Sequence, residues 1–187
     1  GKTTTVVQVL GLLQEIAIEQ GKMLRIRLAA PTGKAAARLT ESISTAIRSL
    51  PEKLLASIPT EVTTLHRLLG TRHDSRHFIH NRNNRLHVDL LVVDEASMID
   101  LEMMDALLNA LPPQARLILL GDKDQLSSVE AGSVLGDICA NESNPCYRPE
   151  TVDFLKKATG YNIYELSGNG TGLEQQIVGL RKIHRFH

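Results

Sequence analysis

Two short stretches contain residue types that can hold a nucleotide phosphate. The chain begins GKTT, directly ahead of a helical period, and a later aliphatic run ends in Asp94 and Glu95. In a phosphate-binding loop, backbone N–H groups and a lysine hold the β- and γ-phosphates, and the next hydroxyl binds Mg²⁺. Read alone, GKTT is also compatible with a solvated lysine at a helix start. The candidate nucleotide-binding residues are Gly1, Lys2, Thr3 and Thr4.

The acidic pair makes a phosphate site more specific. A buried strand that ends in two carboxylates is costly unless the charges have a purpose. In a nucleotide hydrolase Asp94 would hold Mg²⁺ through water, and Glu95 would act as general base toward the attacking water. The other interpretation is a strand end followed by a helix cap. Together with Lys2 far upstream, the pair predicts a P-loop NTPase that uses ATP and Mg²⁺.

Further polar residues also follow strand-like runs. Gln125 comes just past a third aliphatic run and could sense a γ-phosphate or orient water, although an isolated turn would read the same way. Thr32 and Lys34, in the stretch APTGKAAAR, lie at a strand–turn–helix junction, which is either a second anion site or plain capping by Thr32. Thr64 and His66 belong to the stretch TLHRLLG, where His66 could equally be a core histidine.

The elements that must position these residues alternate along the chain. Hydrophobic runs at 23–30, 88–94 and 115–121 have strand character, and helical periods follow GKTT and occupy 33–50 and 101–111. This alternation predicts βαβ units and a parallel sheet covered by helices on both faces, in a three-layer αβα fold. Ligands of such α/β sheets bind beyond the carboxyl ends of the strands, where every candidate residue falls.

Composition limits the class of protein. The chain has 187 residues, of which 42% are hydrophobic and 3% aromatic, so its core must be aliphatic. The formal net charge is zero, so any binding of a polyanion must come from a local patch. Cys139 and Cys146 are too few for a disulfide framework and lack metal-ligand spacing. We find no leader or membrane-spanning run, which predicts a cytoplasmic protein without a membrane partner.

The segment 70–87 departs from the layered pattern because it is strongly basic. It holds four arginines and four histidines against one aspartate, and its NRNN run indicates a turn, so we expect a small accessory β-hairpin or loop. One hypothesis is that its charges contact DNA phosphates; the other is that it is a solvated loop. A short helix is expected near 149–158. The four arginines are Arg72, Arg76, Arg82 and Arg85.

The sequence stretches described above, in their order along the chain, resemble the motifs of superfamily 1 DNA helicases. The motif sequences are most similar to those of the RecD group, the alpha subunits of exodeoxyribonuclease V. GKTTT resembles motif I, LAAPTGKAAARL motif Ia, TLHRLLG the next DNA-contacting motif, LLVVDEASMID motif II, LLGDKDQLSSVEAGSVLGDICA motif III and LRKIHRF motif IV. The resemblance covers essentially the whole chain.

The resemblance implies a motor that moves 5′→3′ on single-stranded DNA. It would be driven by ATP and Mg²⁺, in a complex with RecB and RecC that processes double-stranded DNA ends. By position, Lys2 would hold the β/γ-phosphates, Thr3 would bind Mg²⁺ with Asp94, and Arg185 would be a transition-state arginine. Glu95 would be the base and Gln125 the γ-phosphate sensor. The residues that would face the DNA strand are Thr32, Lys34, Thr64 and His66.

Parts of the helicase pattern are absent from the chain. The start of motif I and motifs V and VI are missing, so residues 1–187 are expected to be an N-terminal RecA-like motor domain truncated at both ends. Such a piece would bind ATP poorly and be inactive alone. Two other functions stay open: a nucleotide-switched interaction module, which Gln125 and Glu95 disfavour, and a DNA-independent P-loop ATPase, which Thr32 and the TLHRLLG block disfavour.

Overall fold

A computed structural model of the chain describes residues 2–72, 75–122, 134–140 and 144–180. The chain divides into two compact units, a first unit up to Val134 and a second unit that begins at Leu135. Each unit is described by itself.

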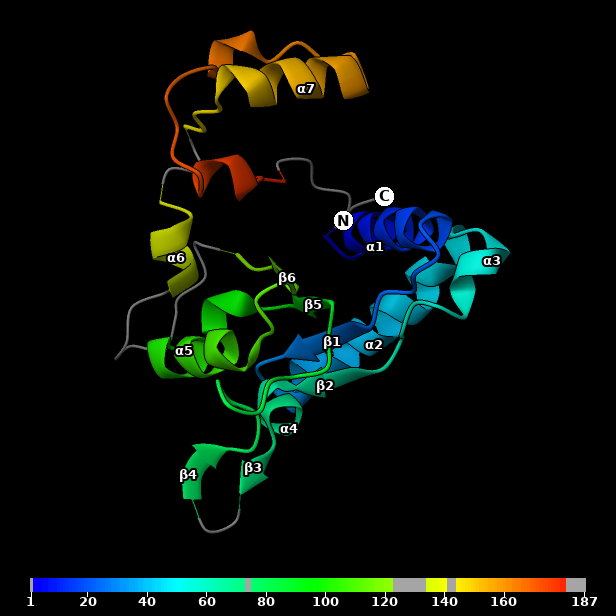
Figure 1. The fold of residues 1–187 in the computed structure, drawn as a ribbon, viewed down its shortest axis with the longest axis vertical. Coiled ribbons are helices and arrows are strands. Elements are labelled where there is room, and N and C mark those ends of the chain that lie inside the picture. The colour runs from blue at the N-terminus through cyan, green and yellow to red at the C-terminus, as the bar shows by residue number, and fades with distance from the viewer. Residues whose placement is uncertain (1, 73–74, 123–133, 141–143, 181–187) are drawn as a thin grey trace. The chain divides into compact units, whose positions relative to one another are not determined.

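The first unit is built on a parallel sheet (Figure 1). Its spatial order is β2-β1-β5-β6, and every neighbouring pair runs parallel. The predicted parallel α/β sheet is therefore confirmed, and the three predicted runs supply β1, β5 and β6. β2 was not predicted, because its three residues are too few to show a periodic pattern. The strands are β1 (Ile26–Ala30), β2 (Val62–Thr64), β5 (Leu90–Val93) and β6 (Arg116–Leu119).

Helices cover both faces of this sheet, which gives the predicted three layers. On one face α1 (Lys2–Glu19) and α2 (Gly33–Ala46) share a core cluster with Leu28 and Val92. The alternate strand residues, such as Leu91, are equally buried and point to the other face. There α4 (Leu65–Leu69) contacts β1, β2 and α5 (Leu101–Ala110). All four residues of β5 are buried, as expected of a strand covered on both sides. The remaining short helices of this unit are η1 (Ile47–Ser49), α3 (Glu52–Leu55) and η2 (Ala96–Met98).

The buried side chain of Gln14 joins α1 to the amino ends of the strands. The Leu24 N–H donates to Gln14 Oε1 over 2.9 Å, and Gln14 Nε2 donates to the Ser57 carbonyl over 3.0 Å. Gln14 has no exposed surface, so both partners depend on it for their hydrogen bonds. Because the later part of α1 is tied to Leu24, just before β1, the Lys2 end of this helix of about 27 Å points toward the carboxyl ends of the strands.

We expect Gln14→Leu to lower the free energy of unfolding by about 1–3 kcal/mol, because it leaves the N–H of half-buried Leu24 and the carbonyl of half-buried Ser57 without these hydrogen bonds. Urea unfolding of the protein measures this change. The matched control is Gln8→Leu, at an exposed position of the same helix, which should leave the unfolding free energy nearly unchanged. Equal effects of the two substitutions would contradict the role given to Gln14.

An ion pair fastens the amino ends of β1 and β5. Arg25 donates from Nε and Nη2 to the two carboxylate oxygens of Asp89 over 2.9 and 2.8 Å, and its backbone N–H donates to Asp89 Oδ2 over 2.8 Å. The side-chain hydrogen bond from Arg25 is the main reason that the pKa of Asp89 falls from its ordinary 3.8 to about 2. The pair therefore favours the folded state only while Asp89 is ionised.

This lowered pKa predicts a specific dependence of stability on acid pH. The folded-state pKa of Asp89 lies below the unfolded value, so the contribution is fully present above about pH 4 and is lost as the pH falls toward 2. Urea unfolding at a series of pH values should show this loss, and Asp89→Asn should flatten the curve within that window. A variant curve that keeps the full slope between pH 4 and pH 2 would show that other carboxylates carry it.

The 70–87 segment begins with an antiparallel pair, β3 (Thr71–Arg72) and β4 (Ser75–Phe78). Asn81 and Asn84 then exchange backbone hydrogen bonds of 3.0 and 3.1 Å across a tight turn. Arg82 donates to Asn109 Oδ1 of α5 over 3.0 Å, and Arg85 donates to the Leu111 carbonyl over 3.0 Å. Two of the four arginines grouped by the sequence thus anchor the turn to α5, so the phosphate-contact hypothesis no longer rests on them.

The second unit contains α6 (Val134–Ile138) except for its first residue, the helix α7 (Pro149–Thr159) and the short helices η3 (Tyr164–Leu166) and η4 (Glu174–Gln176). The helix expected near 149–158 is confirmed as α7. Arg148 donates from Nε to the Gly170 carbonyl over 3.0 Å, and Tyr147 donates its hydroxyl to the Ile177 carbonyl over 3.1 Å, which ties the following loop to the start of α7. Among the residues that the structure describes, no helix has the length and apolar character needed to cross a membrane.

Candidate functional site

The carboxyl edge of the sheet gathers most of the candidate residues that lie in the described part of the chain. Ala30, at the end of β1, pairs with Thr64, at the end of β2, and the Asp94 N–H donates to the Ala29 carbonyl over 3.0 Å. Because all four strands are parallel, the residues that follow them emerge at one edge. The sheet register therefore places Thr32, Thr64 and Asp94 along the same side of the molecule.

The start of α1 belongs to this edge as well. Val6 and Val7, in its first turns, share the core cluster with Val92 of β5, and Leu120, just past β6, packs against the same cluster. Lys2 and Thr3 are half-buried at the N-terminus of this helix, while Thr4 is exposed. The N–H groups at the start of a helix and its dipole attract anions, so this terminus fits a phosphate.

Backbone hydrogen bonds hold the acidic pair between its neighbouring strands. The Leu120 N–H donates to the Val93 carbonyl, and the Ala96 N–H donates to the Leu120 carbonyl, each over 2.8 Å. Between these bonds Glu95 has φ 53° and ψ 39°, which is a left-handed backbone conformation. No other non-glycine residue of the described ranges has a positive φ. Such a conformation costs about 1–2 kcal/mol, and strain of this kind is typical of functional sites.

Two polar atoms at this turn are buried without a hydrogen-bond partner. They are Glu95 Oε2 and Ser97 Oγ, and they are the only such side-chain atoms among the described residues. A buried carboxylate oxygen without a donor is costly, so this site fits a bound group that donates a proton to it, as an attacking water does. The oxygen atoms of Asp94 and Thr3 are the hard ligands that Mg²⁺ prefers. Ser97 was not singled out from the sequence, although it lies only two residues past Glu95.

Two of the four residues expected to face DNA, Thr32 and His66, line one cavity. Thr32 and His66 line a hollow of about 150 Å³ together with Met98, Ile99 and Asp100, which follow the acidic pair. The segment 94–100 therefore begins at Asp94 and Glu95 and ends in the cavity between the two blocks that are expected to face DNA. This proximity could not be read from the sequence, because it depends on the order of the strands.

The contacts of these residues bear on the alternatives left open by the sequence. The Thr32 hydroxyl accepts from the Ala35 N–H over 3.2 Å, and the Thr64 hydroxyl accepts from the Arg67 N–H over 3.3 Å, so both threonines are helix caps. Capping leaves a lone pair of each hydroxyl available and does not exclude a DNA contact. His66 is exposed and meets the Phe78 ring edge-on at 5.9 Å, so the core-histidine interpretation is wrong. Lys34 is exposed near the start of α2.

Three candidate residues lie outside the described residues. These are Gly1, Gln125 and Arg185, and their expected roles as phosphate ligand, γ-phosphate sensor and transition-state arginine stay predictions.

Comparisons with known proteins agree with this arrangement. The profile of a family described as "AAA domain" matches residues 1–131. The chain is 48% identical over 169 residues to the RecBCD enzyme subunit RecD of Haemophilus influenzae, which covers 87% of the chain and 26% of that protein. It is 55% identical over 143 residues to the corresponding subunit of Mycolicibacterium smegmatis, covering 74% of the chain and 26% of the relative. With the ATP-dependent RecD2 DNA helicase of Deinococcus radiodurans it shares 40% identity over 132 residues, or 71% of the chain and 15% of the relative. The chain thus spans about a quarter or less of the length of these curated relatives.

Proposed function

The chain belongs to the AAA domain family, in the group that holds the RecD motors, and from this premise we propose that it is part of a helicase that couples ATP hydrolysis to movement on single-stranded DNA. The observation that carries the proposal is the segment 94–100. It joins the carboxylates of the nucleotide site to the cavity lined by Thr32 and His66, so a change at one site can shift the other.

Each described residue has a role in this proposal. Lys2 binds the β/γ-phosphates at the start of α1, and Thr3 with Asp94 holds Mg²⁺, which when bound neutralises charge that develops on the phosphates. Glu95 accepts the proton of the attacking water at its buried oxygen, and the left-handed backbone fixes its direction. The DNA strand binds to Thr32, Lys34, Thr64 and His66. Its phosphates face the N–H groups at the start of α2 and the side chain of Lys34.

The finer parts of the proposal concern direction, partners and place. We propose movement 5′→3′ and action on double-stranded DNA ends within an exodeoxyribonuclease V complex that includes RecB and RecC, in the cytoplasm. The relatives named as RecBCD enzyme subunits support this part, because the matches with them cover 87% and 74% of the chain. A complete motor requires groups beyond those of the present chain, since closure around ATP takes two such domains.

The test is ATP hydrolysis by the intact protein with and without single-stranded DNA. We expect strong stimulation by DNA, because the nucleotide and strand sites share one segment. Hydrolysis at the same rate without DNA would favour a DNA-independent ATPase, and ATP binding without turnover would favour a nucleotide-switched interaction module. Direction is then read from displacement of a blocked strand placed on one side or the other of a single-stranded tract.

A further inference from the structure

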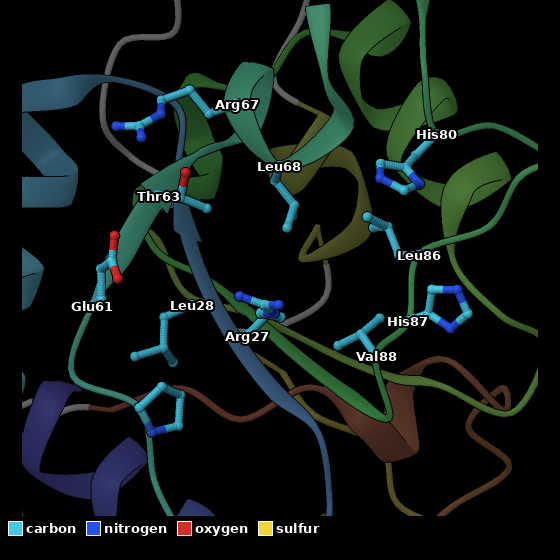
Figure 2. Close-up of a pocket in the computed structure, with 11 residues that line it drawn as sticks. Arg27, Leu28, Glu61, Thr63, Arg67, Leu68, His80, Leu86, His87 and Val88 are labelled. Atoms are coloured by element: carbon cyan, nitrogen blue, oxygen red, sulfur yellow. The ribbon is translucent and has the colours of Figure 1, made fainter.

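An open hollow lies over the amino-terminal half of the sheet, on the face that carries α4 (Figure 2). Its volume is about 430 Å³, and its walls come from β1, β2, α4 and the residues just before β5. Arg27 projects into it from β1, an inner strand with neighbours on both sides. Ala29 lies on the same face of β1 and is fully buried. The residues that pack over this face of β1 therefore cover Ala29 but leave Arg27 exposed.

The polar lining of this hollow is mostly basic. Arg27 lies at its centre, with His87 on one side and Thr63 on the other, while Arg67 lies at the rim (Figure 2). Glu61 is the acidic residue of the lining. Within the described ranges, neither arginine side chain has a hydrogen-bond or ion-pair partner, so their donors are available to a ligand. An arginine without a partner on an inner strand is unusual, since strand faces near the core are normally apolar.

The hollow is separate from the carboxyl edge described above. Arg27 lies in the first half of β1, and Val88 leads into β5, whereas Thr32 and Asp94 follow the other ends of these strands. None of the residues assigned above to ATP or DNA lines it. Leu68, Leu86 and Val88 supply an apolar wall, which displaces water and strengthens the attraction between a guanidinium and an anion. Any ligand here is therefore additional to those of the proposed nucleotide and strand sites.

We infer that this hollow, the Arg27 pocket, binds a phosphate group of a nucleic-acid strand. A guanidinium matches the oxygens of a phosphate in a fork of two hydrogen bonds, and Thr63 and His87 offer further donors nearby. The chain has no net charge, so a polyanion must be held by local patches of this kind. The inference rests on the proposed function, because it takes the DNA strand on which the motor moves as the source of the phosphate.

The experiment measures binding of a fluorescent oligothymidylate by the intact protein over a range of salt concentrations. Arg27→Gln is expected to weaken binding about fivefold at moderate salt and to reduce the slope of log K against log salt by about 0.7, the value for one phosphate contact on a single strand. Glu61→Gln, which removes the acidic group of the lining, is expected to shift affinity in the opposite direction. Arg48→Gln, at an exposed position just after α2, is the charge-matched control and should change neither quantity.

The outcomes separate this inference from the proposed function. If the wild-type protein shows DNA-stimulated hydrolysis but Arg27→Gln and Arg48→Gln have the same DNA affinity and salt slope, the Arg27 pocket is not a phosphate site. The proposed motor function would then remain supported. If Arg27→Gln loses binding to polyglutamate but keeps its DNA slope, the pocket binds protein carboxylates and the inference is overturned. If the wild-type protein does not bind DNA, both the inference about the Arg27 pocket and the proposed function are wrong. Arg27 is exposed, so thermal melting of the variant should match the wild type and exclude misfolding.

Discussion

Glu95→Gln is expected to reduce ATP turnover by the intact protein about a hundredfold to ten-thousandfold while leaving ATP bound with nearly wild-type affinity. The amide has the shape of the carboxylate but cannot accept the proton of the attacking water, and general-base catalysis contributes a factor of this size. The buried position of Oε2 without a partner makes Glu95 the available base at this edge of the sheet. Steady-state hydrolysis with saturating single-stranded DNA measures turnover, and binding of a non-hydrolysable ATP analogue measures affinity.

The control for this prediction is Glu102→Gln in α5. Glu102 is exposed and close in sequence, so its substitution changes the net charge equally without touching the buried turn. We expect its turnover to equal that of the wild type. If Glu95→Gln instead hydrolysed ATP at the rate of the Glu102→Gln control, another group would be the base, and the strained conformation of Glu95 would need a different explanation.

Lys2→Gln is expected to abolish measurable hydrolysis in the intact protein and to weaken ATP binding, with no loss of folding stability. The lysine lies at the N-terminus of α1, where its charge adds to the partial positive charge of the helix at the proposed phosphate site. Removing one preorganised group that stabilises transition-state charge typically lowers turnover a hundredfold to a thousandfold. Because Lys2 is only half-buried, urea unfolding should give the wild-type free energy.

Lys22→Gln supplies the matched control for the second prediction. Lys22 is exposed just past the other end of α1, so the substitution removes the same charge far from the carboxyl edge of the sheet. Its hydrolysis rate and ATP affinity should be unchanged. Turnover retained by Lys2→Gln would overturn the assignment of this lysine, and turnover lost equally in both variants would indicate a general effect of charge.

Prediction from the sequence succeeded where the signal is local. The stretch LLVV of β5 is continuous and aliphatic because the strand is buried on both faces, and Asp94 and Glu95 stand out because carboxylates rarely end such a run. Capping by Thr32 was one of the two interpretations that its neighbours allowed, and its hydroxyl does cap α2. The fold class, and the placing of the acidic pair at a strand end, therefore follow from periodicity and residue type without any knowledge of distant contacts, while the nucleotide-binding role of these residues stays a prediction.

Features that depend on contacts between distant segments could not be read in this way. β2 is too short to show a pattern and exists because β1 offers it a parallel neighbour. Arg82 and Arg85 look like part of one basic surface, yet their hydrogen bonds go to α5 and to the residue that follows it. A side chain's partner is chosen by chain topology, which the local sequence does not encode.

The residue types of this chain thus predict a parallel α/β fold, a candidate phosphate site at the start of α1 and an acidic pair after β5, because spacing and burial pattern are properties of short segments. The three-dimensional packing decides which of these groups meet. Strand order brings Thr32 and His66 into one cavity with the residues after Glu95, leaves Glu95 Oε2 buried without a partner, and opens the Arg27 pocket over an inner strand. Those relations arise from pairing between segments far apart in the chain, and the periodicity of a short segment carries no information about such pairing.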